Sequence, residues 1–317
     1  ALYGFKAYFD PSIKVGGYST DPVVRQQEQL ANIGKVLTVL GKLSAGLSSG
    51  AWPDTASPAG KALQAAGIPS RSALLAVGLM AGIPTRSKHV DGTSGPTGAA
   101  ETYPLAVAPA VAILENMGTV GVAGSLLIAD GELLTGGKVF DNSKTDYAKR
   151  LGEDADIFAA ALTGKSSTAG MLAYLSARNP AAPRVTSNPD AVAKMNSQYQ
   201  LQGKIEVPTI QIAATADHIT PPGAAQYLIN QYNKSVSNMT SSAGKLVNIW
   251  NKPDDSYTEF SSAGSPVTPT VTTNGTGHCN YTTSQILAVA KLAANAAKTG
   301  KAPSAATVKA AIKNEPN

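Results

Sequence analysis

Apolar side chains at three- and four-residue spacing dominate the first two thirds of the chain. Leu30, Ile33, Leu37 and Leu40 follow the pair Asp21–Pro22 in this way. An aspartate before a proline is typical of a helix start, so we expect a helix from there to about Leu43. The same periodicity predicts further helices within residues 60–82, 104–117, 147–162, 167–177 and 188–199. Residues 1–20, with several glycines and a proline, are predicted to form a loop.

The stretch 119–140 fits two structures. Asp130–Gly131 lies between the apolar stretches Leu126–Ile128 and Leu133–Leu134, as in the turn of a β-hairpin. The same residues are equally compatible with a helix, and both alternatives stay open. Either way, no succession of strands and helices occurs before Ile205, so residues 1–200 are expected to be mostly helical and without a parallel sheet of their own.

The pattern changes at Ile205. A β-branched run reaches Ile212, with Pro208 near its start, and is typical of a buried parallel strand. Small residues end the run and an acid, Asp217, follows. A carboxylate at the C-terminal end of such a strand faces the edge where open α/β sheets bind ligands.

The remainder continues as an alternation of helix and strand. We expect a helix over 224–232, a strand over Lys245–Trp250, and a long loop rich in Ser, Thr, Pro and Gly over 253–277. His278 ends that loop. An amphipathic helix then begins at Thr283 and ends at Gly300, and one more short helix is expected in the polar tail.

The order strand, Asp217, helix, strand, His278, helix resembles the C-terminal part of the α/β-hydrolase superfamily. The stretch 215–222 is similar to that family's acid loop, and Gly277-His278 is similar to its Gly-His turn. Ala214 stands where the family often has glycine. The spacing between acid and histidine is longer than usual, and the loop 253–277 accounts for the excess.

This resemblance implies an α/β fold in which residues 1–200 form a large, mostly helical lid or insertion. Residues 201–317 would form the C-terminal part of an α/β-hydrolase-like core, with a sheet that is incomplete in this chain. It also implies that Asp217 orients His278, which acts as general base and then general acid. The alternative is structural: Asp217 caps the helix near Pro221, and His278 caps or lines a loop.

The nucleophile of such a site is not identified. The pattern Gly-x-Ser-x-Gly occurs at residues 46–50 and makes Ser48 a weak candidate, because a helix precedes it and Trp52–Pro53 follows it where a helix should begin. We therefore expect the nucleophile on a companion N-terminal segment or chain, and the present chain to be a processed piece. His218 is expected to face solvent or the lid, and His89 to be a surface residue.

Cys279, the single cysteine of the chain, directly follows His278. This pair is similar to the tannase and feruloyl esterase family, in which that cysteine bridges to one beside the nucleophilic serine. With no second cysteine here, Cys279 is either a small buried residue or pairs with sequence outside this chain.

Composition narrows the functional classes. With 43% hydrophobic and 15% charged residues, the chain is globular, and its net charge of +5 is spread without a basic cluster, so no nucleic-acid partner is expected. No run of about 18 apolar residues predicts a membrane span. Neither a cofactor nor a metal is expected, since the sequence has no dinucleotide fingerprint and its three histidines are far apart. Asn-x-Ser/Thr tripeptides, which favour a secreted glycoprotein, begin at Asn233, Asn238, Asn274 and Asn280.

The resulting hypothesis is a serine-type hydrolase, an esterase acting on a hydrophobic or aromatic ester that is either a small molecule or a polymer. Small apolar residues in the helical region would line its acyl pocket. The alternative is a non-catalytic, hydrolase-like scaffold that acts in binding or surface assembly.

Overall fold

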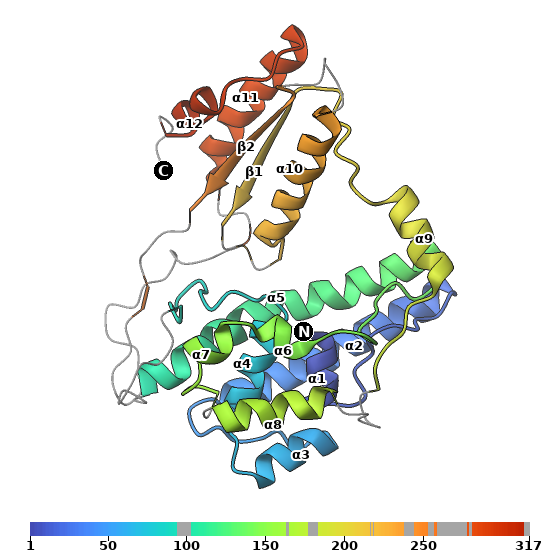
Figure 1. Cartoon of the computed structure of the whole chain (residues 1–317), viewed down its shortest axis with the longest axis vertical. Helices are drawn as coiled ribbons and strands as arrows, with labels where there is room; N and C mark the ends of the chain where they lie inside the picture. The colour runs from blue at the N-terminus through green and yellow to red at the C-terminus, as the bar shows by residue number, and fades with distance from the viewer. Residues whose placement is uncertain are drawn as a thin grey trace. The chain divides into compact units, whose positions relative to one another are not determined.

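The computed structural model describes residues 1–93, 103–162, 165–176, 183–215, 217, 219–237, 244–252, 257–258, 278 and 281–313. These residues fall into two compact units (Figure 1). The helical unit comprises the described residues up to Tyr199 together with Tyr257 and Thr258. The sheet unit comprises the described residues of 200–252 and those from His278 onward. Each unit has its own apolar core.

The helical unit is built from helices of very different length. They are α1 (Leu2–Tyr8), α2 (Pro22–Gly46), α3 (Pro58–Ala65), α4 (Ser70–Met80), α5 (Tyr103–Thr135), α6 (Tyr147–Leu151), α7 (Asp154–Ile157), α8 (Lys165–Ser176) and α9 (Pro189–Gln198). The predicted start of α2 is confirmed: Asp21 Oδ1 accepts the backbone N–H groups of Val23 and Val24, both at 2.9 Å.

The longest helix, α5, packs against α2, α4 and α9 (Figure 1). Glycines allow two of these close approaches. A Cβ on Gly121 would lie 2.7 Å from Val36 Cγ1 on α2, and a Cβ on Gly78 of α4 would lie 2.5 Å from Ile113 Cδ1 on α5. Both distances are too short for a real contact, so the helix spacing depends on the missing side chains.

Polar contacts tie α2 to α5 as well. Asn32 is 2% exposed, and its Nδ2, with two N–H groups to donate, lies 3.0–3.1 Å from the three acceptors Lys14 O, Tyr18 Oη and Ser125 Oγ. Its Oδ1 accepts from the backbone N–H of Lys14 at 2.7 Å. A buried amide with this many partners specifies one register of α2 against α5.

In this unit the structure decides one open alternative and overturns one expectation. The hairpin alternative at Asp130–Gly131 is excluded, because both residues lie inside the continuous helix α5. The expected loop over residues 1–20 contains α1, whose aromatic side chains are buried against the core. Burial therefore overrides the weak local helix signal of a segment that contains Gly4.

The apolar helix α5 also bears on the expectation that no membrane span is present. Its stretch Val107–Thr135 is long and apolar enough to cross a membrane, with a mean hydropathy of 1.6, and 33% of the most apolar window is buried. Length and composition of this kind are shared by core helices of soluble proteins, so they do not identify a span.

The sheet unit contains β1 (Thr209–Ala214), α10 (Pro222–Val236), β2 (Leu246–Asn251), α11 (Thr283–Thr299) and α12 (Ala305–Lys313). The two strands pair in parallel, with Thr209 beside Leu246 and Ala214 beside Asn251. A small core of Val247, Ile249 and Val308 joins β2 to α12. Helix α11 begins with a capping box between Thr282 and Gln285, one residue before the expected cap, and ends at Gly300, whose φ is +66°.

The predicted fold class is wrong for the described residues. An α/β-hydrolase-like core requires a many-stranded parallel sheet, whereas the described part of this chain is mostly helical and holds only the two-stranded sheet β1–β2. The alternation of strand and helix after Ile205 was correctly read, but it amounts to a single β-α-β unit followed by two helices. The family-level architecture inferred from that local order does not follow from it.

Candidate acid–histidine site

The candidate site lies at the C-terminal ends of the parallel strands. Asp217 follows β1 by three residues, and Thr215 continues the strand pairing by donating its backbone N–H to Asn251 O at 2.9 Å. The side chain of Asp217 is only 2% exposed. A carboxylate buried at this edge of a parallel pair occupies the usual place for a functional group in a β-α unit.

Asp217 uses both carboxylate oxygens. Oδ1 accepts the backbone N–H groups of Ile219 at 2.7 Å and Thr220 at 2.9 Å. Oδ2 accepts the Thr220 hydroxyl and lies against Nδ1 of His278, each at 2.8 Å. The two residues expected from the sequence to act together, Asp217 and His278, are therefore in contact in the structure.

These contacts determine the charge state of Asp217. Burial by itself would raise the pKa of the carboxyl group, because it disfavours the charged form. The backbone N–H groups of Thr220 and Ile219, the Thr220 hydroxyl and His278 all stabilise the carboxylate, and their combined effect lowers the pKa of Asp217 below its ordinary value. Asp217 is therefore an anion at neutral pH and a fixed hydrogen-bond acceptor for the imidazole.

The imidazole of His278 contacts Asp217 and is partly exposed. Its Nδ1 faces Asp217, and 37% of the side chain is exposed. When Nδ1–H donates to a carboxylate, the neutral imidazole has its lone pair on Nε2, which can accept a proton from a reacting group. The arrangement is chemically able to perform general base and general acid catalysis at Nε2.

The other sequence candidates lie elsewhere. Ser48 is exposed in the turn after α2, in the helical unit, and its backbone oxygen accepts from Arg71 Nη1 at 3.0 Å. This is a helix-terminating turn and not a strand-to-helix elbow. His89 is half-exposed, as expected for a surface residue, but it has a partner that the sequence did not indicate, Glu115 Oε1, at 3.2 Å. His218 and Cys279 lie outside the described residues.

Sequence reasoning missed Thr220, which contributes two of the contacts to Asp217. The available signal was the spacing Asp-x-x-Thr, because an aspartate commonly accepts hydrogen bonds from the residues two and three positions later. No group of three or more His, Cys, Asp or Glu side chains that could hold a metal occurs among the described residues.

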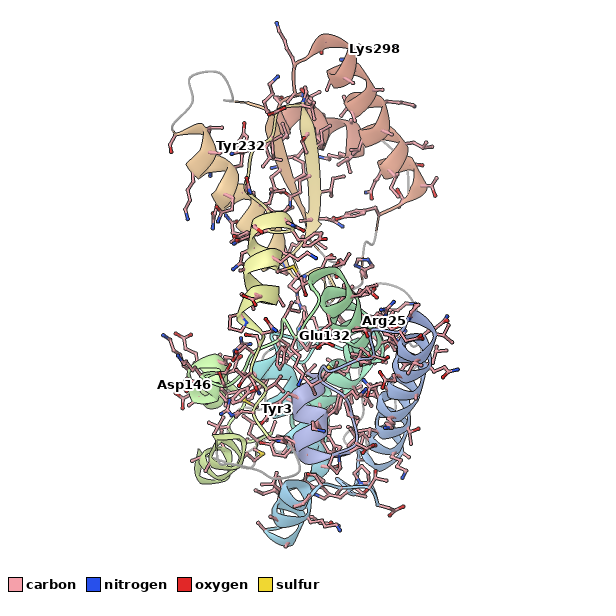
Figure 2. The ribbon with its side chains drawn as sticks, turned by 90° about the vertical axis from the view of Figure 1, so that its right-hand side faces the viewer. Tyr3, Arg25, Glu132, Asp146, Tyr232 and Lys298 are labelled. Atoms are coloured by element: carbon pink, nitrogen blue, oxygen red, sulfur yellow. The ribbon has the colours of Figure 1, made fainter. Side chains whose placement is uncertain are left out.

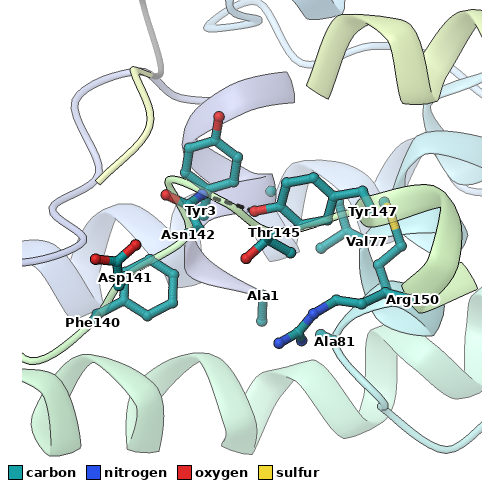
Figure 3. A pocket seen from close by; sticks show the side chains of 12 residues that line it. Ala1, Tyr3, Val77, Ala81, Phe140, Asp141, Asn142, Thr145, Tyr147 and Arg150 are labelled. Atoms are coloured by element: carbon teal, nitrogen blue, oxygen red, sulfur yellow. Dashed lines mark hydrogen bonds between the residues drawn. The ribbon is translucent and has the colours of Figure 1, made fainter. Parts of the chain in front are cut away.

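A separate small pocket of about 80 Å³ lies in the helical unit (Figure 3). Tyr3 and Tyr147 stack in its wall with ring centroids 5.9 Å apart, and Asn142 Nδ2 donates to the Tyr147 hydroxyl at 2.8 Å. Asp141, also in the wall, is engaged by Ser143 and Ser187. Asn142 and Asp141 are thus held by partners within the helical unit.

Comparisons with known proteins give no further guide. No protein-family model, no curated protein and no solved structure matches this chain. The function of this chain must therefore be inferred from the geometry of the site.

Proposed function

We propose that this chain supplies the acid–base pair of a serine-type ester hydrolase. The observation that supports the proposal is the 2.8 Å contact between the buried carboxylate of Asp217 and Nδ1 of His278. In this reaction Asp217 holds the imidazole in the tautomer with a proton on Nδ1. Nε2 removes the proton of the attacking hydroxyl and returns it to the leaving alcohol.

The nucleophile is the part that a companion segment or chain would provide. Ser48 is a poor choice because its turn lacks the geometry that exposes a nucleophile above a sheet. The proposed substrate class, a hydrophobic or aromatic ester, rests on composition alone, since Ala, Leu and Val predominate in residues 1–200. Secretion and glycosylation stay proposals that rest on the Asn-x-Ser/Thr tripeptides.

Labelling with a fluorophosphonate probe tests the proposal. The sample is the native material, meaning this chain as isolated from its source together with any companion segment or chain. We expect covalent labelling of one serine, and mass spectrometry of the labelled peptide identifies it. His278→Ala should abolish labelling, because the base that activates the serine is removed, whereas Ser48→Ala should leave it unchanged. Absence of labelling in the complete native material would instead favour the non-catalytic scaffold, in which Asp217 only stabilises the turn before α10.

A further inference from the structure

A cavity of about 260 Å³ lies in the helical unit, between the end of α5 and the start of α2. The segment that precedes α2 and the segment that follows α5 complete its wall. Its lining includes Tyr18, Arg25, Ala129, Glu132, Leu133 and Lys138. None of these residues takes part in the acid–histidine site.

Two cations, Arg25 and Lys138, line this cavity, and one nitrogen of Arg25 lacks a hydrogen-bond partner among the described residues. Nη1 of Arg25 is buried and has no hydrogen-bond partner among the described residues. Lys138 extends along the opposite segment, and its Nζ lies 3.8 Å from the position of a Cβ at Gly17. A buried guanidinium N–H without an acceptor is costly, and a ligand oxygen in the cavity would supply that acceptor.

The carboxylate in the wall, Glu132, already accepts hydrogen bonds from the backbone. Glu132 is 8% exposed and accepts the backbone N–H of Gly17 with both oxygens at 2.9 Å, and that of Tyr18 with Oε2 at 2.9 Å. It therefore shapes the loop and does not neutralise Arg25 directly. Counting Arg25 and Lys138 against Glu132, the lining carries one positive charge in excess, which suits a ligand with a single negative charge.

The rest of the wall favours an apolar body on that ligand. Ala129 and Leu133 contribute methyl groups, and Tyr18 contributes its ring, because its hydroxyl is hydrogen-bonded to Ser125 and Asn32. The volume is just below the range of about 300–1,000 Å³ that is usual for drug-sized ligands. The ligand must therefore be small.

We propose that this cavity binds a small monocarboxylate with a short apolar chain. Arg25 and Lys138 receive the carboxylate, and Ala129 and Leu133 contact the chain. Figure 2 labels Arg25 and Glu132, which come from α2 and α5, in the helical unit that contains the cavity. Arginine suits this role because its planar fork matches a carboxylate. The inference does not depend on the proposed hydrolase activity.

Calorimetric titration of the full chain with hexanoate tests the proposal. Arg25→Gln should weaken hexanoate binding about tenfold or more, because a charge-assisted hydrogen bond is lost. Lys42→Gln, on the same helix and outside the cavity, should leave the affinity unchanged. Hexan-1-ol, with the same chain and no charge, and inorganic phosphate, with too much charge beside Glu132, should each bind at least about tenfold more weakly than hexanoate.

Equal hexanoate affinity of the parent protein and Arg25→Gln, or no hexanoate binding, would overturn the proposal. Phosphate binding as tight as hexanoate binding would overturn the carboxylate assignment. A second measurement needs no variant: in the unmodified protein, nuclear Overhauser effects should join the hexanoate methylene protons to the Leu133 methyl and Tyr18 ring protons. If hexanoate binds and these effects are absent, the ligand lies elsewhere and the proposal is wrong.

Discussion

Asp217 and His278 meet through one carboxylate oxygen, Oδ2, which lies 2.8 Å from Nδ1 of the imidazole. The other oxygen, Oδ1, accepts the backbone N–H groups of Ile219 and Thr220. One side chain thus stabilises the turn before α10 and orients the histidine. Substitutions that separate these two tasks distinguish a catalytic from a structural role.

The turn itself predicts different stabilities for two substitutions of Asp217. Asparagine retains an amide oxygen that can accept the N–H groups of Ile219 and Thr220, whereas alanine leaves both donors without it. We expect Asp217→Ala to lower the free energy of unfolding by about 1–3 kcal/mol, and Asp217→Asn to lower it by less. Urea denaturation of the three proteins measures this. Equal losses of unfolding free energy in Asp217→Ala and Asp217→Asn would show that the turn does not depend on the side-chain oxygen of residue 217.

The lowered pKa of Asp217 predicts a pH dependence of stability. A carboxyl group whose pKa is lower in the folded state binds fewer protons there, so its contribution is present above the unfolded pKa of about 3.9. That contribution is lost as the pH falls from there through the folded pKa. The difference in unfolding free energy between the parent protein and Asp217→Asn should therefore shrink as the pH falls below about 3.9. A difference that did not shrink in that acidic range would contradict the assignment.

The buried amide of Asn32 predicts a large effect in the helical unit. Asn32→Ala removes the partner of the Lys14 backbone, the Tyr18 hydroxyl and Ser125 at once. We expect a loss of about 1–3 kcal/mol for each group that water cannot reach. Thr38→Ala is the matched control on the same helix, because Thr38 is exposed and, among the described residues, its hydroxyl donates to Gly34 O. Similar midpoints of thermal unfolding for the two variants would refute the argument.

Two glycines of α5 offer an opposed pair of substitutions. Gly121→Ala places a methyl group 2.7 Å from Val36 Cγ1 and should destabilise the protein by about 1–3 kcal/mol. Gly118→Ala meets nothing within 4 Å and should stabilise the helix by about 0.5–1 kcal/mol. Calorimetric unfolding should move the two midpoints in opposite directions. Movement in the same direction would mean that α2 and α5 are not in close contact at Gly121.

The elements predicted correctly are those whose signals are local. Asp21 before Pro22 identified the start of α2, and Gly300 identified the end of α11, because capping depends on residues adjacent in the chain. The helix α1 was missed because burial of its aromatic side chains against distant helices stabilises it. The continuity of α5 through Asp130–Gly131 likewise depends on tertiary packing.

The candidate sites likewise divide into features with a local sequence signal and features that depend on tertiary packing. The order of strands and helices indicated that Asp217 and His278 belong together, and Asp-x-x-Thr was a readable signal for the Thr220 contacts. The cavity with Arg25 and Lys138 had no sequence signal, since its residues come from segments more than a hundred positions apart. The number of strands in the sheet was also beyond local reasoning, because a strand's neighbours depend on tertiary pairing.

The central claim is that Asp217 and His278 act together in catalysis, and one kinetic comparison tests it most directly. The value of kcat/KM for p-nitrophenyl butyrate is measured for the native material and for the same material with Asp217→Asn, at a temperature where both are folded. Asparagine preserves the turn but favours the wrong imidazole tautomer, so we predict a fall of about 10³- to 10⁴-fold. A variant with unchanged kcat/KM would contradict the claim and leave Asp217 as a structural residue.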